Sequence, residues 1–111
     1  MDGRIVRIAE LDIDPAQLAA YRRLLAEEIE ASVDNEPGVL MLHAVSEKER
    51  PERIRILEVY ANRDAYDAHL QTPHFLKYKA GTADMVKGLK LVDADPVMMR
   101  GKTLDQRHEL G

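Results

Sequence analysis

The 111-residue sequence predicts a single α+β domain, in which strands and helices follow one another in the order β-α-β-β-α-β. Its length is typical of one domain. Runs rich in β-branched and aromatic residues alternate with longer runs whose apolar residues recur at helical spacing. Proline, glycine, asparagine and aspartate separate these runs, and such residues end helices and strands. We expect the domain to cover residues 1–100, followed by a polar C-terminal tail at 101–111.

The first strand is predicted at residues 4–13, where β-branched residues are frequent. Asp14 follows it as a suitable helix N-cap, because its carboxylate can accept a hydrogen bond from a free backbone N–H of the first turn. Pro15 fits the first helical position, and Gln17 stands where a capping box places a glutamine. These signals predict that the first helix begins at Pro15.

One apolar stripe runs along this first helix at spacings of three and four residues: Leu18, Tyr21, Leu25, Ile29 and Val33. Pro37 and Gly38 cannot continue a helix, so the helix must end near residues 34–38. The stripe is the side that we expect to pack on a sheet.

Two further strands are predicted at residues 39–46 and 54–60, joined by a polar connector at 47–53. Both faces of the first are apolar, with Leu40, Leu42 and Ala44 on one face and Val39, Met41, His43 and Val45 on the other. In the second, Ile54, Ile56, Glu58 and Tyr60 share one face, and Arg55, Leu57 and Val59 share the other. Strands that are apolar on both faces are typical of a sheet covered on both sides.

Two helical segments follow these strands. One is predicted at residues 62–70, with Asn62 as its N-cap. The other is predicted at 72–87, where Thr72 and Pro73 provide a new start.

The last strand is predicted at residues 89–99, after Gly88 ends the helix, and Pro96 places its later part at an edge or a bend. The resulting order is that of the ferredoxin-like split βαβ fold, an antiparallel sheet with two helices on one side. The helices cover one face of this sheet, yet two strands are apolar on both faces. We therefore predict a homodimer in which the open faces of two sheets pack together.

Composition excludes several classes of function. The net charge is −4 and both signs are mixed along the chain, which argues against the basic stripe that nucleic-acid binding requires. The chain has no cysteine, so disulfides, thiolate metal sites and cysteine nucleophiles are excluded. No run approaches the roughly 20 apolar residues of a membrane span, and the N-terminus lacks a signal-peptide core. We expect a cytoplasmic protein with no nucleic-acid or membrane partner.

His69 and His74 are candidates for metal ligands. They lie five positions apart, about 140° around a helix, whereas histidines that share a metal on one helix are three or four positions apart. Thr72 and Pro73 interrupt the segment between them, so the two side chains could converge only from two helical pieces. The spacing therefore predicts no metal site.

The same two histidines are candidates for proton transfer. His69 lies on the inner side of the short helix, three positions after Tyr66. His74 lies in the first turn of the next helix, where free N–H groups and the helix dipole disfavour a protonated imidazole. A neutral imidazole, with an ordinary pKa of about 6.5, is a suitable base near neutral pH. The alternative is structural: His69 donates to a carbonyl at the helix end, and His74 is solvated.

Glu58 lies in mid-strand between apolar residues, where an unpaired carboxylate would be costly to bury. It could orient a histidine for catalysis, or it could form a structural ion pair with an arginine such as Arg7. His43 is likewise a polar residue in an apolar strand, and it either lines a cavity or is a hydrogen-bonded core residue. Three aromatic residues are candidates for the core or for the wall of a binding site: Tyr60, Phe75 and Tyr78.

The segment EVYANRDAYDAHLQTPHFLKY, residues 58–78, resembles the signature of the antibiotic biosynthesis monooxygenase domain family. The family pattern has a glutamate and an aromatic residue at the end of the third strand, here Glu58 and Tyr60. A helix with a histidine follows, here His69, and then a Pro-His-aromatic turn, here residues 73–75.

The resemblance extends over about residues 4–99, and EPGVL at 36–40 is similar to the family's turn into the second strand. It implies a dimeric α+β barrel and chemistry without flavin, haem or metal. Family monooxygenases, including proteins named as quinol monooxygenases, oxidise small quinol-like or phenolic substrates with molecular oxygen. In such a reaction a base removes a proton, and the resulting anion passes one electron to oxygen before the radical pair recombines.

The resemblance also implies roles for particular residues. His69, His74 and Glu58 are the candidate catalytic groups, with His69, His74 or His43 as the base and Glu58 orienting it. The candidate substrate-binding residues are His43, Tyr60, Tyr66, Phe75 and Tyr78.

Other functions of the family remain alternatives. One branch isomerises a phosphorylated autoinducer by moving protons, and it shares the Thr-Pro-His turn. Such a substrate also requires basic residues that bind its phosphate, and no such set is evident in this sequence. A non-catalytic dimer that binds a small molecule is the third alternative. A haem-degrading branch uses a tryptophan where this chain has Tyr60 and a histidine where it has Lys79, and the absence of tryptophan argues against that activity.

Overall fold

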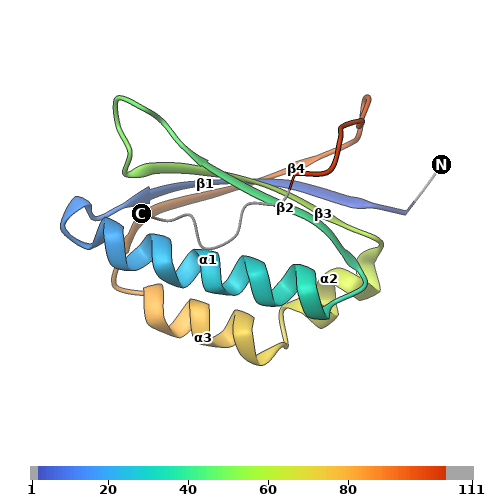
Figure 1. Cartoon of the computed structure of the whole chain (residues 1–111), viewed down its shortest axis with the longest axis horizontal. Helices are drawn as coiled ribbons and strands as arrows, with labels where there is room; N and C mark the ends of the chain where they lie inside the picture. Colours follow the sequence, from blue (N-terminus) through green and yellow to red (C-terminus); the bar gives the residue numbers. More distant parts are fainter. Residues whose placement is uncertain (1–2, 105–111) are drawn as a thin grey trace.

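The computed structural model describes residues 3–104, which form a four-stranded antiparallel sheet with helices packed against one face (Figure 1). The elements follow in this order: β1 (Ile5–Ile13), η1 (Pro15–Gln17), α1 (Leu18–Asn35), β2 (Val39–Ser46), β3 (Arg53–Tyr60), α2 (Arg63–His69), α3 (Pro73–Thr82) and β4 (Val86–Ala94). The strand order across the sheet is β2-β3-β1-β4. The predicted α+β, ferredoxin-like arrangement is confirmed.

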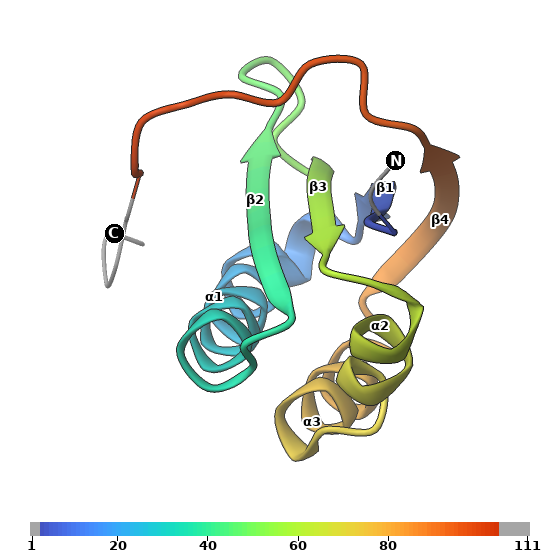
Figure 2. The same cartoon turned by 90° about the vertical axis from the view of Figure 1, so that its right-hand side faces the viewer.

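Helices α1 and α3 pack side by side under the sheet, and α2 lies under one end of it (Figure 1, Figure 2). The main core forms between α1 and the two central strands, and its buried members are Ala9, Leu11, Ile13, Tyr21, Leu25, Ile54 and Ile56. A smaller cluster of Val39, Leu42 and Tyr60 continues it toward α2. The layer between sheet and helices is therefore apolar along most of its length.

The start of the first helix differs from the prediction, because Pro15–Gln17 forms a separate 3-10 turn and α1 begins at Leu18. Asp14 caps this turn, since its carboxylate accepts a hydrogen bond from the backbone N–H of Ala16 at 3.1 Å. The capping residue was predicted correctly, but the α-helical hydrogen bonds begin about one turn later.

A bulge in β2 between Val39 and Met41 changes the predicted faces of that strand. Val39 pairs with Tyr60 and Leu42 pairs with Glu58, so both side chains lie on the face covered by helices. The sequence prediction placed Val39 and Leu42 on opposite faces, because strict alternation has no place for the extra residue of a bulge.

The boundary between α3 and β4 also differs from the prediction of a helix that continues to about Lys87. The helix ends at Thr82, and β4 begins at Val86. Gly88, which was predicted to end the helix, lies inside the strand opposite Asp12, where an added Cβ would lie 3.4 Å from the Asp12 carboxylate. Residues from Val86 onward pair with the backbone of β1, and these inter-strand hydrogen bonds outweigh the local preference of residues 83–87 for a helix.

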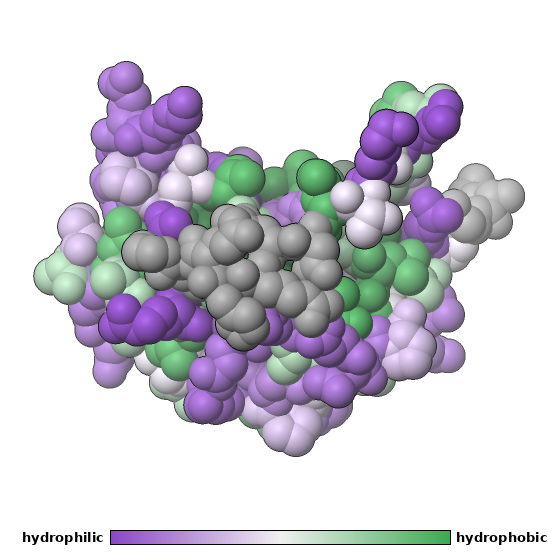
Figure 3. All heavy atoms as spheres, viewed as in Figure 1, coloured by the Kyte–Doolittle hydropathy of each residue, from purple (hydrophilic) through white to green (hydrophobic). Residues whose placement is uncertain are grey.

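The open face of the sheet is apolar in its central part, where the pairing register brings together Val6, Ile8, Met41, Leu57, Val59 and Val92. Toward one end it becomes polar, with Glu10 between Arg55 and Lys90 on the neighbouring strands. Figure 3 shows this side of the molecule hollowed between two raised ends, with apolar side chains on the floor.

After β4 ends at Ala94, residues 95–104 form no helix or strand and cross the open side of the sheet from the β4 edge toward β2 (Figure 2). Pro96 lies in this segment, so the predicted strand at 89–99 ends before it. Of the predicted tail at 101–111, residues 105–111 lie outside the described residues. Within residues 3–104, no helix has both the length and the apolar character needed to cross a membrane.

Gly38 lies where β2 begins, against α2. A Cβ atom at this position would collide with the Cβ of Ala65, and the Gly38 backbone is fixed because its carbonyl accepts a hydrogen bond from the Ala61 N–H at 2.8 Å. We therefore expect Gly38→Ala to lower the free energy of unfolding by about 1–3 kcal/mol, the usual cost of overpacking. Urea denaturation measures the effect. Gly101→Ala is the control, because no heavy atom lies within 4 Å of its added Cβ, and equal losses in both variants would contradict the explanation.

Candidate functional site

A pocket of about 410 Å³ lies between the helices and the sheet. Its wall is mostly apolar and aromatic, and the charged or titratable side chains in it include Arg7, Glu28, Glu58, His69 and Lys79. Six of the eight predicted site residues line this pocket: Glu58, Tyr60, Tyr66, His69, Phe75 and Tyr78. His74 and His43 are not part of its wall.

Glu58 and Tyr60 reach the pocket from the same face of β3, because they are two positions apart in a strand. The Tyr60 hydroxyl donates a hydrogen bond to Glu58 Oε1 at 2.7 Å. Of the two partners expected for Glu58, neither a histidine nor Arg7 makes this hydrogen bond, although Arg7 lies opposite Glu58 in the register of β1 and β3. The sequence thus indicated the half-buried carboxylate but not the tyrosine that donates a hydrogen bond to it.

Burial raises the pKa of Glu58, and the nearby Glu28 carboxylate adds to this effect. The Tyr60 hydrogen bond and the Arg7 charge act in the opposite direction without cancelling it. The pKa of Tyr60 is also raised, by burial and then by the Glu58 carboxylate. Tyr60 therefore remains a neutral donor at neutral pH, and Glu58 holds a proton more strongly than an ordinary glutamate.

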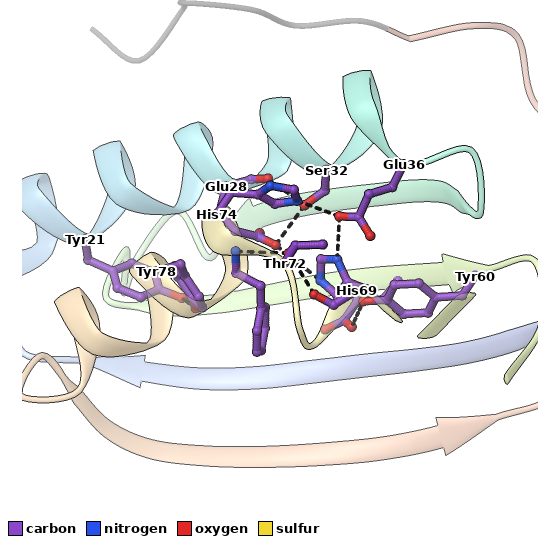
Figure 4. A network of polar contacts seen from close by, with 11 residues as sticks. Tyr21, Glu28, Ser32, Glu36, Tyr60, His69, Thr72, His74 and Tyr78 are labelled. Carbon is purple, nitrogen blue, oxygen red and sulfur yellow. Dashed lines mark hydrogen bonds and ion pairs between the residues drawn. The ribbon is translucent and has the colours of Figure 1, made fainter. Parts of the chain in front are cut away.

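His69 ends α2 and is 2% exposed. Its two ring nitrogens face different carboxylates of α1 and its C-cap, since Nδ1 lies 3.0 Å from Glu36 Oε2 and Nε2 lies 3.3 Å from Glu28 Oε1 (Figure 4). Burial alone would lower the pKa of His69, but the hydrogen bonds and charges of Glu28 and Glu36 outweigh burial, so the net shift is upward. This arrangement favours an imidazolium, which is a poor base.

His74 lies in the first turn of α3 and contacts the same glutamate, with its Nε2 at 2.6 Å from Glu36 Oε2. The two histidines converge because the helix is interrupted at Thr72, which places His69 at the end of α2 and His74 in the first turn of α3. The Thr72 hydroxyl donates to the His69 carbonyl at 2.8 Å and accepts from the Phe75 N–H at 3.3 Å. The sequence predicted that the two histidines could converge only if they lay on two separate helical segments, and this is the arrangement in the structure.

Glu28 and Glu36 were not identified from the sequence as members of the site. A signal for Glu28 was present, because Tyr21, Leu25, Glu28 and Ser32 are the buried residues of α1 and follow one another at helical spacing. Ser32 supports Glu28 by donating to its Oε1 at 3.0 Å. Val33, which was predicted to continue the stripe, is 45% exposed. Two polar residues thus continue the buried stripe of the helix.

Arg7 enters the pocket from β1 and is held by three contacts. It donates hydrogen bonds to the Tyr66 hydroxyl and, at 3.2 Å, to Asp93 Oδ1, and its guanidinium lies 4.6 Å from the centre of the Tyr66 ring. Tyr66 therefore acts as a support for a cation in the pocket wall.

Tyr78 approaches the pocket from α3, and its hydroxyl lies 2.6 Å from that of Tyr21. Burial raises the pKa of Tyr78 to about 12, so the hydroxyl keeps its proton at neutral pH. The neighbouring Phe75 ring packs 5.0 Å from the His69 imidazole, centre to centre. Together these rings make one wall of the pocket aromatic.

His43 lies on the open face of the sheet, opposite Leu57 of β3, and its side chain is exposed. The sheet separates it from the pocket. The structure therefore brings His43 neither into this cavity nor into the core, which were the two positions considered from the sequence.

The arrangement combines an electron-rich, largely apolar cavity with one carboxylate of raised pKa, neutral tyrosine donors and cationic groups. Such a set can remove a proton from a substrate and stabilise the anion that remains. Glu36, His69 and His74 each offer one metal-ligating atom, and these atoms lie within 4.8 Å of one another.

Comparisons with known proteins identify the family. The profile described as "Antibiotic biosynthesis monooxygenase" matches residues 4–81. A crystal structure from Bacteroides thetaiotaomicron, whose name assigns it to the same group, is 51% identical, with 92% of this chain and 97% of that chain covered and a TM-score of 0.88. No match was found among curated proteins.

Two more solved structures have the same fold. One, from Caulobacter crescentus and named in the same way, is 26% identical, with 86% of this chain and 92% of that chain covered and a TM-score of 0.76. The other, named as a monooxygenase of Lactobacillus acidophilus, is 28% identical and has a TM-score of 0.80, with 82% of this chain but only 43% of that chain covered. Because the family profile spans most of the sequence and the Bacteroides protein matches it over nearly its full length, the chain belongs to the antibiotic biosynthesis monooxygenase family.

Proposed function

We propose that the protein is a cofactor-independent monooxygenase that oxidises a small quinol-like or phenolic substrate with molecular oxygen. The observation that carries the proposal is Glu58, a carboxylate of raised pKa in the wall of a mostly apolar pocket. A carboxylate with a raised pKa is a stronger base when ionised and is therefore better suited to take a proton from a weakly acidic substrate. Membership of the family supports the class of reaction.

The size and lining of the pocket support a small aromatic substrate. Its volume of about 410 Å³ falls within the range of roughly 300–1,000 Å³ that is typical of small-molecule sites. Four aromatic side chains line it, and their rings can pack against a planar substrate: Tyr60, Tyr66, Phe75 and Tyr78.

In this proposal Glu58 is the base, whereas the sequence favoured a histidine. His69 is held between two carboxylates and supplies positive charge next to the substrate anion. His74 lies outside the pocket and acts through Glu36, which it shares with His69. Tyr78 remains protonated and can donate a hydrogen bond to a substrate oxygen.

The reaction can be written for an anthrone-type substrate. Glu58 removes one proton, and the delocalised anion transfers one electron to oxygen, giving a substrate radical and superoxide. These recombine to a peroxide, which takes the proton back from Glu58 and becomes a hydroperoxide. Glu58, ionised again, then removes the remaining hydrogen of the same carbon as a proton, the O–O bond breaks, and the departing hydroxide takes this proton to leave as water. One oxygen atom then remains in the product as a carbonyl group and the other is released in water.

Oxygen uptake tests the proposal, with chelator-treated protein and a panel of anthrone and naphthohydroquinone substrates. We expect uptake that depends on the protein and persists after chelator treatment. Uptake no faster than that of the Glu58→Gln variant across the panel would contradict the proposal. Turnover of a hydroxyketone without oxygen would instead indicate the isomerase, and ligand binding without any turnover would indicate a binding protein.

The raised pKa of Glu58 also predicts how stability depends on pH. A group whose pKa is higher in the folded state favours folding most at low pH, and this contribution is lost as the pH rises through its folded pKa. Glu58→Gln removes the cost of the buried charge and keeps an acceptor for Tyr60. We therefore expect Glu58→Gln to raise the melting temperature at pH 8, with a gain that disappears below the ordinary glutamate pKa of about 4.3. A gain that is equal at pH 4 and pH 8 in thermal unfolding would disagree with this explanation.

The open face of the sheet supports the predicted homodimer. Its apolar central residues, such as Ile8 and Leu57, would be covered if a second copy packed the same face against them. Light scattering coupled to gel filtration would give twice the chain mass of 12.6 kDa for such a dimer. A mass of one chain at micromolar concentration would argue against it.

A further inference from the structure

We propose that Glu36, His69 and His74 form a binding site for a divalent transition-metal ion of the Zn²⁺ type. Two imidazoles and one carboxylate are a donor set that such ions prefer. The three ligand atoms lie within 4.8 Å of one another, although the residues come from three separate parts of the chain. This site goes beyond the proposed oxidation, which requires no metal.

The donor atoms point to a common place. His69 Nδ1 lies 3.0 Å and His74 Nε2 lies 2.6 Å from the same oxygen, Glu36 Oε2. In a tetrahedral zinc site the donors lie about 2.0–2.2 Å from the ion and therefore about 3.4 Å from one another. Glu36 Oε2 has to withdraw from the two nitrogens by less than about 1 Å to admit the ion. The nitrogens themselves, which lie within 4.8 Å of each other, have to lie about 3.4 Å apart in the loaded site. Glu36 is the extended C-cap residue after α1, so its side chain is not fixed by helical neighbours on both sides.

His69 also has the support that metal-bound histidines usually have. Such a histidine donates its second ring N–H to a carboxylate or carbonyl, which fixes the orientation of the ring. Here Nε2 of His69 faces Glu28 Oε1 at 3.3 Å, and Glu28 is itself held by the Ser32 hydroxyl at 3.0 Å (Figure 4). The nitrogen on the opposite side of the ring, Nδ1, is the one directed at Glu36 and His74.

The site is accessible and lies beside the pocket. The side chains of Glu36 and His74 are 13% and 19% exposed, so an ion can enter from their side and keep a water molecule as a fourth ligand. Glu36 and His74 are absent from the pocket wall, whereas His69 and Glu28 belong to it. A bound ion would therefore be coordinated by Nδ1 of His69 and would not occupy the substrate cavity.

This proposal departs from the expectation drawn from the sequence. A spacing of five positions does not allow His69 and His74 to share a metal ion on one continuous helix. The turn at Thr72 places the histidines on two helices, and Glu36 adds a third donor from a distant part of the chain.

Titration of the full-length, chelator-stripped protein with ZnCl₂ in a calorimeter tests the proposal. We expect one ion per chain and a rise in melting temperature on binding. His74→Ala removes a ligand whose side chain is partly exposed, so the variant should fold and bind at least about 100-fold more weakly. Glu28→Gln, which alters only the support of His69, should weaken binding by about 10–100-fold. His43→Ala is the matched control, because this exposed histidine lies on the far face of the sheet, and its affinity should not change.

The absence of one-to-one binding would overturn the proposal. So would binding that His74→Ala and Glu36→Gln leave unchanged, because the ion would then occupy another site. Addition of Co²⁺ gives an independent spectroscopic readout, since loss of its visible absorption in folded His74→Ala would place the ion at this residue. None of these measurements requires a substrate, so their failure would leave the proposed oxidation untouched.

Discussion

Replacement of His69 by alanine is expected to lower the free energy of unfolding by about 3–5 kcal/mol, the usual cost of removing one partner from a buried ion pair. His69 lies between Glu28 and Glu36. Each of its two ring nitrogens contacts one of these carboxylates, so a single imidazolium lies between two negative charges. Without it, Glu28 would be left buried without its imidazolium partner, and Glu36 would keep only the contact with His74. Urea denaturation of chelator-treated protein at pH 7 measures the loss.

Two other histidines provide matched controls for this prediction. His74 contacts only Glu36 among these acids and is partly exposed, so His74→Ala should cost less than His69→Ala. His43 is exposed on the open face, and His43→Ala should change stability by no more than about 0.5 kcal/mol. A loss at His69 that is no larger than the loss at His74 would show that the two acids do not depend on this imidazolium.

Replacement of Glu58 by glutamine is expected to lower the rate of substrate oxidation by about 10²–10⁴-fold, the usual contribution of a general base. Glutamine has nearly the same shape and can still accept the hydrogen bond from Tyr60, but it cannot take a proton. The loss should therefore appear in kcat, because the cavity that binds the substrate is preserved. Steady-state oxygen uptake over a range of substrate concentrations separates kcat from KM.

Glu27→Gln is the control for this variant. Glu27 is an exposed residue of α1 that pairs with Lys77 at 2.6 Å and does not line the pocket, so this change should leave both constants unaffected. If Glu58→Gln retained full activity while His69→Asn or His74→Asn lost it, the base would be a histidine, as the sequence had favoured.

The order of elements could be predicted because each signal is local. Asp14, Asn62 and Thr72 all cap the helical turns that follow them, and each accepts a hydrogen bond from a backbone N–H of that first turn. Alternation in β3 correctly placed Glu58 and Tyr60 on the same face, and the structure shows that this face lies toward the helices and the pocket. The alternation of apolar residues along a strand and the N-cap of a helix depend only on residues that are close in sequence. Both can therefore be predicted from the sequence alone.

What the sequence could not provide depends on distant contacts. The bulge at Val39 and the early start of β4 are decided by which backbone groups the neighbouring strands offer. The pairing of His69 with Glu28 and Glu36 joins residues more than 30 positions apart, and no local pattern announces it. Glu28 was the exception, because a charged residue on the buried stripe of α1 is visible in the sequence.

The most direct test of the proposed monooxygenase activity is oxidation of an anthrone-type substrate under ¹⁸O₂ by chelator-treated protein, with the product analysed by mass spectrometry. We expect that each product molecule gains one ¹⁸O atom, that labelled water forms in equal amount, and that Glu58→Gln slows both. A product without label, or oxygen consumed only to hydrogen peroxide, would contradict a monooxygenase that uses this pocket.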